Sequence, residues 1–180
     1  DAETLGAIAY PVAVNYQEDA LEIVDTQGRS LLSLVHTPGG QIEDYQASRG
    51  GDTFAGVDFV QRTLRQAADA EGDKFSGLVH PADGQYFFVA GPVRAADGTL
   101  VGAVLVGRQL DTLVRRLRQS GDVEITLYAA DGSPAASTLI ATGSTEYNLS
   151  QAQVAEILSR QDTASLVREV NAAQVLYGEM

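Results

Sequence analysis

Short apolar runs separated by glycine-containing turns dominate the chain, a pattern typical of antiparallel strands. The turns Ala82-Asp83-Gly84 and Ala96-Asp97-Gly98 join three such runs, because an Asp-Gly pair favours a tight connection. An earlier pair of runs flanks Thr26-Gln27-Gly28, where Gly28 supplies the positive φ that the turn needs. A five-stranded antiparallel sheet is therefore predicted. Its strands are residues 21–25, 29–35, 74–79, 85–94 and 99–106.

Apolar residues spaced three and four positions apart predict a helix over residues 4–16 and a second helix that begins at Asp52 or Thr53. Pro11 lies inside the first helix and is expected to kink it, because proline lacks a backbone donor. The glycine-rich residues 36–51 predict a loop. The predicted buried faces are Leu5, Ile8, Ala9, Val12 and Tyr16 in the first helix, and Phe54, Val57, Val60, Leu64 and Ala68 in the second.

Two segments recur about 90 to 100 residues further along the chain, which indicates two related modules. Residues 20–28 are echoed by 122–132, and residues 76–80 by 164–168. An unrelated appendage after residue 110 is the alternative. The second part predicts a helix at 110–117, strands at 122–129 and 133–139, a helix at 149–160 opened by a Ser150–Gln153 capping box, and strands at 163–169 and 172–178.

Acidic residues outnumber basic ones by 24 to 12, which gives the 180-residue chain a formal net charge of -12. This balance argues against nucleic acid and against electrostatic attachment to anionic lipid, since both need basic patches. The absence of cysteine excludes disulfides, thiol nucleophiles and cysteine-based zinc sites. No run reaches the roughly 18 to 20 apolar residues of a membrane span. Because the chain starts at Asp1 without a signal-type segment, we expect a piece of a longer protein.

Residues able to carry catalysis are scarce. The two histidines, His36 and His80, fall in different predicted elements, with no acidic residue at a recognised metal-ligand spacing. A Gly-x-Ser-x-Gly elbow does not occur, and the glycines lie in turns and strands rather than in a phosphate-binding loop. We therefore expect no enzyme activity, no metal and no cofactor.

A binding pocket on the sheet is the better supported interpretation. Tyr86 and Phe88 share one face of their strand, and Tyr86 can present a hydroxyl at the end of an apolar ring. Arg94 and Arg108 lie near strand ends, where a guanidinium suits a carboxylate or another anion. The alternative is that both arginines pair with neighbouring acids or face water. Tyr45 belongs to the glycine-rich loop, which predicts either a lid or a mobile spacer.

At residues 91–107 the sequence resembles the signature of Cache-type extracytoplasmic sensor domains. These residues read Gly-Pro-Val-Arg-Ala-Ala-Asp-Gly-Thr-Leu-Val-Gly-Ala-Val-Leu-Val-Gly. In that family a strand ends in a Pro-Val-like pair, turns at Asp-Gly and returns through Val-Gly-x-Val-x-Val-Gly. Residues 23–29 resemble the family's opening hairpin, and residues 128–132 resemble the same hairpin in a second module.

The resemblance implies a PAS-like α+β fold, in tandem, on the outer face of a bacterial membrane. Residues 1–17 would end a long helix that rises from the membrane, and residues 18–110 would form the membrane-distal module, where small ligands usually bind. Residues 111–121 would form a connecting helix, and residues 122–180 a partial membrane-proximal module. Such regions are the input of histidine kinases, chemoreceptors and cyclic-nucleotide signalling proteins.

The amino-acid-binding members of this family use a Tyr, Arg, Trp and Asp pattern. This chain has no tryptophan, and Arg108 stands where the Asp is expected after the last strand. An arginine suits an anion better than an ammonium group. The resemblance therefore favours an organic acid or another anion as the ligand.

Two functions are expected from these observations. The first is small-ligand sensing by the extracytoplasmic region of a membrane-anchored receptor, in which the ligand shifts a conformational equilibrium of the helices. The alternative is a structural module that binds no ligand and forms a homodimer through its N-terminal helix. An enzyme is disfavoured because nucleophile, base and metal site are all missing.

Overall fold

The computed structural model describes residues 2–51, 53–81, 84–119, 121, 123–140, 145, 147–159, 169–170 and 175–176. The chain divides into two compact units, called here the first unit (Asp1–Gln109) and the second unit (Leu110–Met180). None of the helices in these described ranges is long and apolar enough to cross a membrane.

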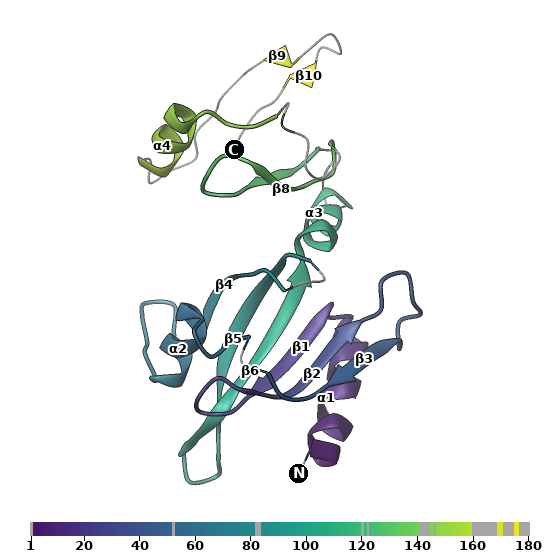
Figure 1. The fold of residues 1–180 in the computed structure, drawn as a ribbon, viewed down its shortest axis with the longest axis vertical. Coiled ribbons are helices and arrows are strands. Elements are labelled where there is room, and N and C mark those ends of the chain that lie inside the picture. The colour runs from purple at the N-terminus through teal and green to yellow at the C-terminus, as the bar shows by residue number, and fades with distance from the viewer. Residues whose placement is uncertain are drawn as a thin grey trace. The chain divides into compact units, whose positions relative to one another are not determined.

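A six-stranded antiparallel sheet forms the centre of the first unit (Figure 1). Its strand order is β3-β2-β1-β6-β5-β4, so the first hairpin and the later meander meet where β1 pairs with β6. The strands are β1 (Ala20–Val24), β2 (Ser30–His36), β3 (Tyr45–Ser48), β4 (Phe75–Val79), β5 (Tyr86–Arg94) and β6 (Leu100–Gln109).

The five predicted strands are confirmed, but the predicted strand number is wrong because β3 adds a sixth. This strand lies inside the predicted loop at residues 36–51 and pairs with β2 at the sheet edge. Three of its four residues are exposed, so it carries no apolar alternation that a sequence pattern can detect.

One face of the sheet is covered by α2 (Asp58–Leu64) and by the segment before it. The helix is shorter than predicted. Phe54 reaches the core from a turn, which Gln61 holds by donating a side-chain hydrogen bond to the Ala55 carbonyl at 2.7 Å. At the other end Gln66 takes a left-handed φ of 58°. The core on this face contains the following buried residues: Ala20, Val24, Phe54, Phe59, Val60, Leu64, Phe75, Val79, Tyr86, Phe88, Ala90, Ala103 and Leu105.

The start of α2 also differs from the prediction. Its N-cap residue is Val57, which makes no side-chain capping hydrogen bond, so Thr53 is not the cap; Asp52 lies outside the described residues. Ala68, predicted to be buried, is exposed because the helix has already ended.

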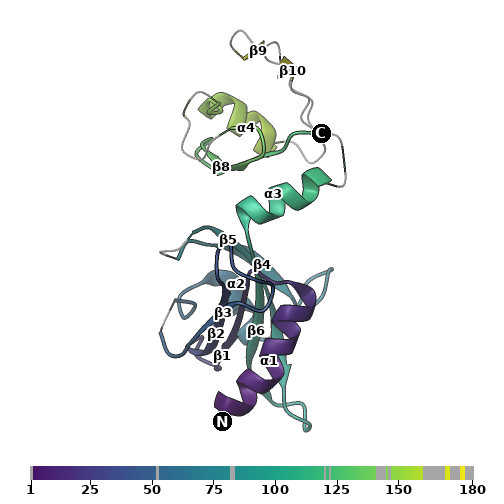
Figure 2. The same ribbon diagram turned by 90° about the vertical axis from the view of Figure 1, so that its right-hand side faces the viewer.

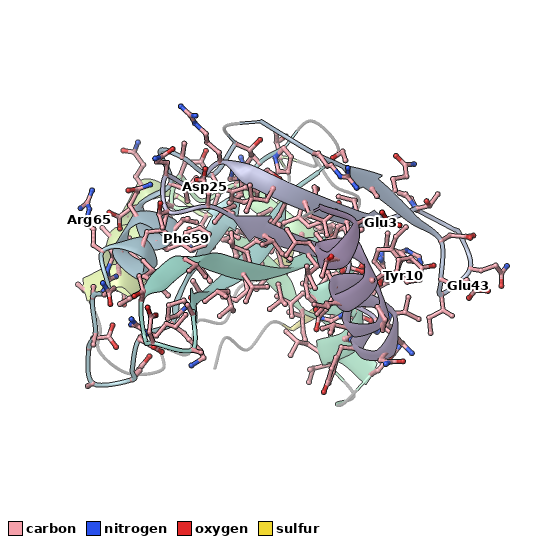
Figure 3. The ribbon with its side chains drawn as sticks, turned by 90° about the horizontal axis from the view of Figure 1, so that it is seen from below. Glu3, Tyr10, Asp25, Glu43, Phe59 and Arg65 are labelled. Atoms are coloured by element: carbon pink, nitrogen blue, oxygen red, sulfur yellow. The ribbon has the colours of Figure 1, made fainter. Side chains whose placement is uncertain are left out.

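The opposite face of the sheet carries α1 (Ala2–Tyr16), which is a single helix (Figure 2). Pro11 lies on its exposed side. Ala9 and Ala13 are buried against the leucines of β1 and β2. These small side chains let the helix backbone approach the sheet closely. Figure 3 shows Tyr10 of α1 beside the loop that carries Glu43, whose carbonyl accepts a hydrogen bond from the Tyr10 hydroxyl.

The predicted buried face of the first helix is partly wrong. Ala9 is buried, but Ile8 and Tyr16 are 64% and 69% exposed, and Val12 is exposed as well. The helix is apolar on more than one side, and the row that contacts the sheet is Leu5, Ala9 and Ala13, at intervals of four. The exposed row is left without a partner within the described residues of the first unit.

The second unit begins with α3 (Leu110–Gln119), followed by a hairpin of β7 (Thr126–Tyr128) and β8 (Pro134–Ser137) and by α4 (Gln151–Ser159). The strands are shorter than predicted. The capping box is confirmed, since Ser150 Oγ accepts from the Gln153 amide at 3.3 Å and Gln153 Oε1 accepts from the Ser150 amide at 2.9 Å.

The predicted buried face of α4 is not found among the described residues. Val154 and Ile157 are half-buried, and Leu158 is 71% exposed. The final strand pair is described only as β9 (Glu169–Val170) and β10 (Val175–Leu176), which pair antiparallel. The rest of the predicted strands at 163–169 and 172–178 lies outside the described residues.

Candidate functional site

A cavity of about 180 Å³ lies in the first unit, between the sheet and the segment that leads into α2. Strand alternation determines which side chains form the cavity wall, because every second residue of a strand points to the same face. Thus β1, β2 and β5 each contribute two side chains. The described lining residues are Ala20, Glu22, Ser33, Val35, Thr53, Phe54, Pro81, Tyr86 and Phe88.

The register of the sheet brings these side chains together. Glu22 is directly opposite Ser33, as β1 pairs with β2. Between β1 and β5 lies Gly107 of β6, which is opposite Phe88. A side chain at Gly107 would place its Cβ only 2.3 Å from Phe88 Cε1. The glycine therefore leaves the space that the Phe88 ring occupies.

Glu22 is the polar centre of the cavity and was missed by the sequence reasoning. Its side chain is buried, at 6% exposure, and Oε2 accepts a hydrogen bond from Ser30 Oγ at 3.0 Å. Burial raises the pKa of the Glu22 carboxyl, and the hydroxyls of Ser33 and Ser30 oppose that shift. The available signal was an acidic residue between Leu21 and Ile23, in a strand with apolar residues on both faces.

Tyr86 and Phe88, both predicted as site residues, lie side by side in the cavity wall. Their rings stack with centroids 5.7 Å apart, and Phe54 meets Phe88 edge-on at 5.3 Å. The Tyr86 hydroxyl accepts a hydrogen bond from Gln109 Nε2 at 2.9 Å. Three aromatic rings thus line one side of the cavity, with a hydroxyl at its edge.

Arg108 lies on the other face of the sheet. It pairs with Phe87 across β5 and β6. Phe87 is next to Phe88, which faces the cavity, so Phe87 and Arg108 point to the opposite face. Its guanidinium donates to the carbonyls of Gln17 at 2.6 Å and Tyr16 at 3.1 Å, and forms a 3.1 Å ion pair with Glu18. Arg108 therefore holds the C-terminal end of α1, where exposed carbonyls favour a cation.

Arg94 lies at the far end of β5, eight residues beyond Tyr86 or about 26 Å along an extended strand. Its exposed guanidinium donates to Gln66 Oε1 at 2.6 Å and to the Gly98 carbonyl at 3.3 Å. The structure thus brings neither predicted arginine to the cavity that contains Tyr86 and Phe88.

Tyr45, the remaining predicted site residue, also belongs to the α1 side. Its hydroxyl lies 2.9 Å from the Ala13 carbonyl and 2.7 Å from the Glu18 carbonyl, and can donate to either. Burial raises the pKa of Tyr45, and the carboxylates of Asp19 and Glu18 raise it further. Tyr45 and Arg108 together fasten the end of α1 to strands on both sides of β1.

Gln109 connects the cavity with this fastening. Its side chain donates to Tyr86, and its backbone amide donates to Asp19 Oδ2 at 2.9 Å. Asp19 immediately precedes β1 and follows the end of α1. A change at the Tyr86 side of the cavity thus has a hydrogen-bonded route to the segment between α1 and the sheet.

The residues that line the cavity are of the kinds found in small-molecule sites. Within the described residues no group of three or more histidine or acidic side chains is placed to hold a metal ion. The cavity combines an apolar, aromatic wall with a few hydroxyls and one carboxyl, which is the usual composition of a small-molecule site.

Comparison with known proteins gives a consistent picture. A family model described as the double sensory domain of two-component sensor kinase matches residues 1–178. No curated protein sequence matches the chain.

Among solved structures, the domain of a protein assigned to the sensory box/GGDEF family from Vibrio parahaemolyticus aligns with a TM-score of 0.61 at 11% identity, covering 94% of this chain and 69% of that one. The extracellular domain of a protein assigned as a histidine kinase aligns with a TM-score of 0.61 at 12% identity, over 93% of this chain and 65% of that one. The sensory domain of a Campylobacter jejuni chemoreceptor gives 0.50 at 12% identity, over 77% of this chain and 53% of that one. The chain thus spans about half to two thirds of these structures, and the likeness is one of fold.

Proposed function

Because the chain belongs to the family of double sensory domains of two-component sensor kinases, we propose that its first unit senses a small molecule bound in the cavity between β1, β2, β5 and the entry to α2. Family membership confirms the Cache-type resemblance, the α+β fold with an N-terminal helix, and the extracytoplasmic location. We further propose that the first unit has no enzyme activity of its own. The receptor that contains it is proposed to be a histidine kinase, a chemoreceptor or a cyclic-nucleotide signalling protein.

The observation that carries the proposal is the buried carboxyl of Glu22 at the cavity wall. A core that serves stability alone gains little from such a group, since burying a carboxyl is costly unless it is fully paired. Here the carboxyl has two serine hydroxyls as partners and faces an open volume lined by aromatic rings. Polar groups held in an apolar pocket are the means by which small molecules are oriented.

The hydrogen bonds of Gln109 support a signalling role for the same cavity. They join Tyr86 in the cavity wall to Asp19 at the end of α1, while Arg108, the preceding residue of β6, binds the last carbonyls of that helix. A ligand that changes the position of Tyr86 would therefore bias the position of α1. It can do so only by binding one arrangement more tightly than the other.

An anionic ligand, predicted from Arg94 and Arg108, receives no support from this geometry. Both guanidinium groups are engaged away from the cavity, one on exposed carbonyl and amide groups and the other at the α1 terminus. The sensing proposal does not depend on them.

The test is a thermal-shift screen of the 180-residue chain against a metabolite library, repeated with Val35→Phe. Val35 lines the cavity, so a phenylalanine ring there should fill it and abolish any shift in melting temperature seen with the wild type. Leu31→Phe is the matched control, since Leu31 of the same strand is exposed and absent from the cavity lining. Binding that survives Val35→Phe would place the ligand elsewhere and overturn the proposal.

The alternative function, a dimerisation module, is favoured by the exposed row Ile8, Val12 and Tyr16 on α1. A second copy of this helix could cover these side chains, at intervals of four, in a two-fold pair. Sedimentation of the wild type and of the double variant Ile8→Glu, Val12→Glu tests this. A dimer that becomes a monomer in the variant supports pairing through α1, and a wild type that stays monomeric at high concentration contradicts it.

A further inference from the structure

The charge of the cavity indicates which class of ligand it takes. Among the lining residues that the structure describes, Glu22 is the one charged side chain. The other polar groups are the hydroxyls of Ser33, Thr53 and Tyr86, and the remaining residues are apolar. An anion in this cavity would lie close to a carboxyl with no basic group beside it, and would be repelled.

Glu22 lacks a cationic partner in the described part of the chain. None of the ion pairs found there includes it, and its hydrogen bonds come from Ser30 and Ser33. Two neutral hydroxyls offset only part of the cost of removing a carboxylate from water. A positive charge at the cavity wall would therefore stabilise the ionised Glu22 carboxyl.

The aromatic part of the cavity lining suits the rest of such a ligand. The rings of Phe54, Tyr86 and Phe88 offer apolar surface, and their faces attract a nearby cation. The volume of about 180 Å³ is close to the roughly 150 Å³ of an apolar protein cavity that binds benzene. The cavity therefore accepts a short molecule.

We propose that the cavity of the first unit binds a small primary ammonium ion with a short apolar body, and that the Glu22 carboxylate is its counter-ion. Ser33, directly opposite Glu22, and Thr53 supply hydroxyl oxygens that can accept the remaining N–H groups. This inference rests on the proposed sensing function and assigns its ligand class. It depends on a carboxylate of β1, on the cavity face of the sheet. The predicted anion site instead depended on Arg94, at the far end of β5, and on Arg108 of β6, on the other face.

The experiment is calorimetry and thermal shift on the 180-residue chain with three probes of similar size: n-butylammonium, butyrate and 1-butanol. We expect n-butylammonium alone to bind and to raise the melting temperature. In Glu22→Gln its affinity should fall about 10- to 100-fold, the factor that corresponds to a charge-assisted hydrogen bond. Glu71→Gln, which removes an exposed carboxylate from the α2–β4 connection, is the control and should bind as the wild type does.

A second readout does not depend on any variant. Binding of the cation should release a proton from the wild type wherever the buried Glu22 is partly protonated, so calorimetry in buffers of different ionisation enthalpy should detect it. In the described part of the chain, Glu22 accepts hydrogen bonds from Ser30 and Ser33 of β2, and Tyr86 of β5 is the other titratable side chain in the cavity lining. An n-butylammonium ion remains charged over the pH range in which Glu22 titrates, as a lysine side chain does.

The outcomes separate the two proposals. Binding of butyrate or butanol that is lost in Val35→Phe would overturn the ammonium assignment and leave the sensing site standing. An affinity for n-butylammonium unchanged in Glu22→Gln would also overturn the assignment. If no probe and no compound of a metabolite library shifts the melting temperature, both the ligand class and the sensing function fall.

Discussion

A single carboxyl, that of Glu22, makes the stability of the first unit depend on pH. Burial raises its pKa in the folded protein above the ordinary value of 4.5, so the folded state holds the proton more tightly than the unfolded state does. The free energy of unfolding contributed by this group therefore falls as the pH rises from the unfolded pKa to the higher folded one.

Glu22→Gln should remove this fall, because the amide keeps the shape and an acceptor oxygen but does not titrate. We expect the variant to equal or exceed the wild type in stability near neutral pH and to lose its advantage below about pH 4. Urea unfolding at a series of pH values measures this. The same slope in wild type and variant, with a change in Glu71→Gln instead, would show that Glu22 is not the group responsible.

The sequence predicted the face on which a residue lies where the strand alternation was unambiguous. Tyr86 and Phe88 lie on the same face of β5, as their spacing of two requires. Arg108 was predicted from its place near a strand end, which does not fix the face: it pairs with Phe87, so it points to the α1 face. Glu22 was overlooked because a glutamate within a strand is usually solvated, and only the burial of both sheet faces made it an internal group.

At the scale of elements, Arg108 and Arg94 form a natural pair for comparison. Arg108 has a partly buried guanidinium, and Arg108→Met removes two hydrogen bonds to α1 carbonyls and the ion pair with Glu18. We expect a loss of about 1–3 kcal/mol in the free energy of unfolding, with faster amide exchange in α1. Arg94→Met, at an exposed strand end, should change stability by less than about 0.5 kcal/mol.

Denaturant unfolding and hydrogen exchange together test this difference. Equal effects of the two substitutions would mean that Arg108 does not hold α1 in place. A loss of small-ligand binding in Arg94→Met would show that Arg94 takes part in ligand binding.

The elements that the sequence failed to delimit are those shaped by tertiary contacts. The edge strand β3 exists because β2 offers it unpaired backbone groups, and its own side chains are largely exposed. The helix α2 begins at Asp58 rather than near Thr53 because the preceding turn, not a helix, delivers Phe54 to the core. Local propensity contains neither piece of information.

Each unit builds its first hairpin in a similar way. In the first unit the turn at Gly28, with φ of 81°, lies against Phe54 and Ala55, just before α2. In the second, the turn at Gly132, with φ of 84°, lies against Leu149, just before α4. At each glycine a side chain would meet backbone atoms at 2.9 Å or less. This shared packing supports the proposal of two related modules. The boundaries predicted for the modules remain part of that proposal.

For the first unit as a whole, the question is whether the cavity and α1 behave as one system. The Tyr86 hydroxyl and the Asp19 carboxylate bind different parts of Gln109, one its side chain and the other its backbone. Groups in one hydrogen-bonded network show interaction energies of about 0.5–3 kcal/mol in double-mutant cycles. We expect a value in this range for Tyr86→Phe combined with Asp19→Ala.

The same cycle in a Gln109→Leu background identifies the carrier. Leucine keeps the backbone bond to Asp19 but cannot donate to Tyr86, so the interaction energy should fall toward zero. Arg94→Met combined with Asp19→Ala is the control and should be additive within about 0.5 kcal/mol, because these residues share no partner. Additivity of Tyr86→Phe and Asp19→Ala in the wild-type background would mean that the cavity wall and the end of α1 are energetically independent. A ligand in the cavity would then need a different route to the helix, through the packing of β1 alone.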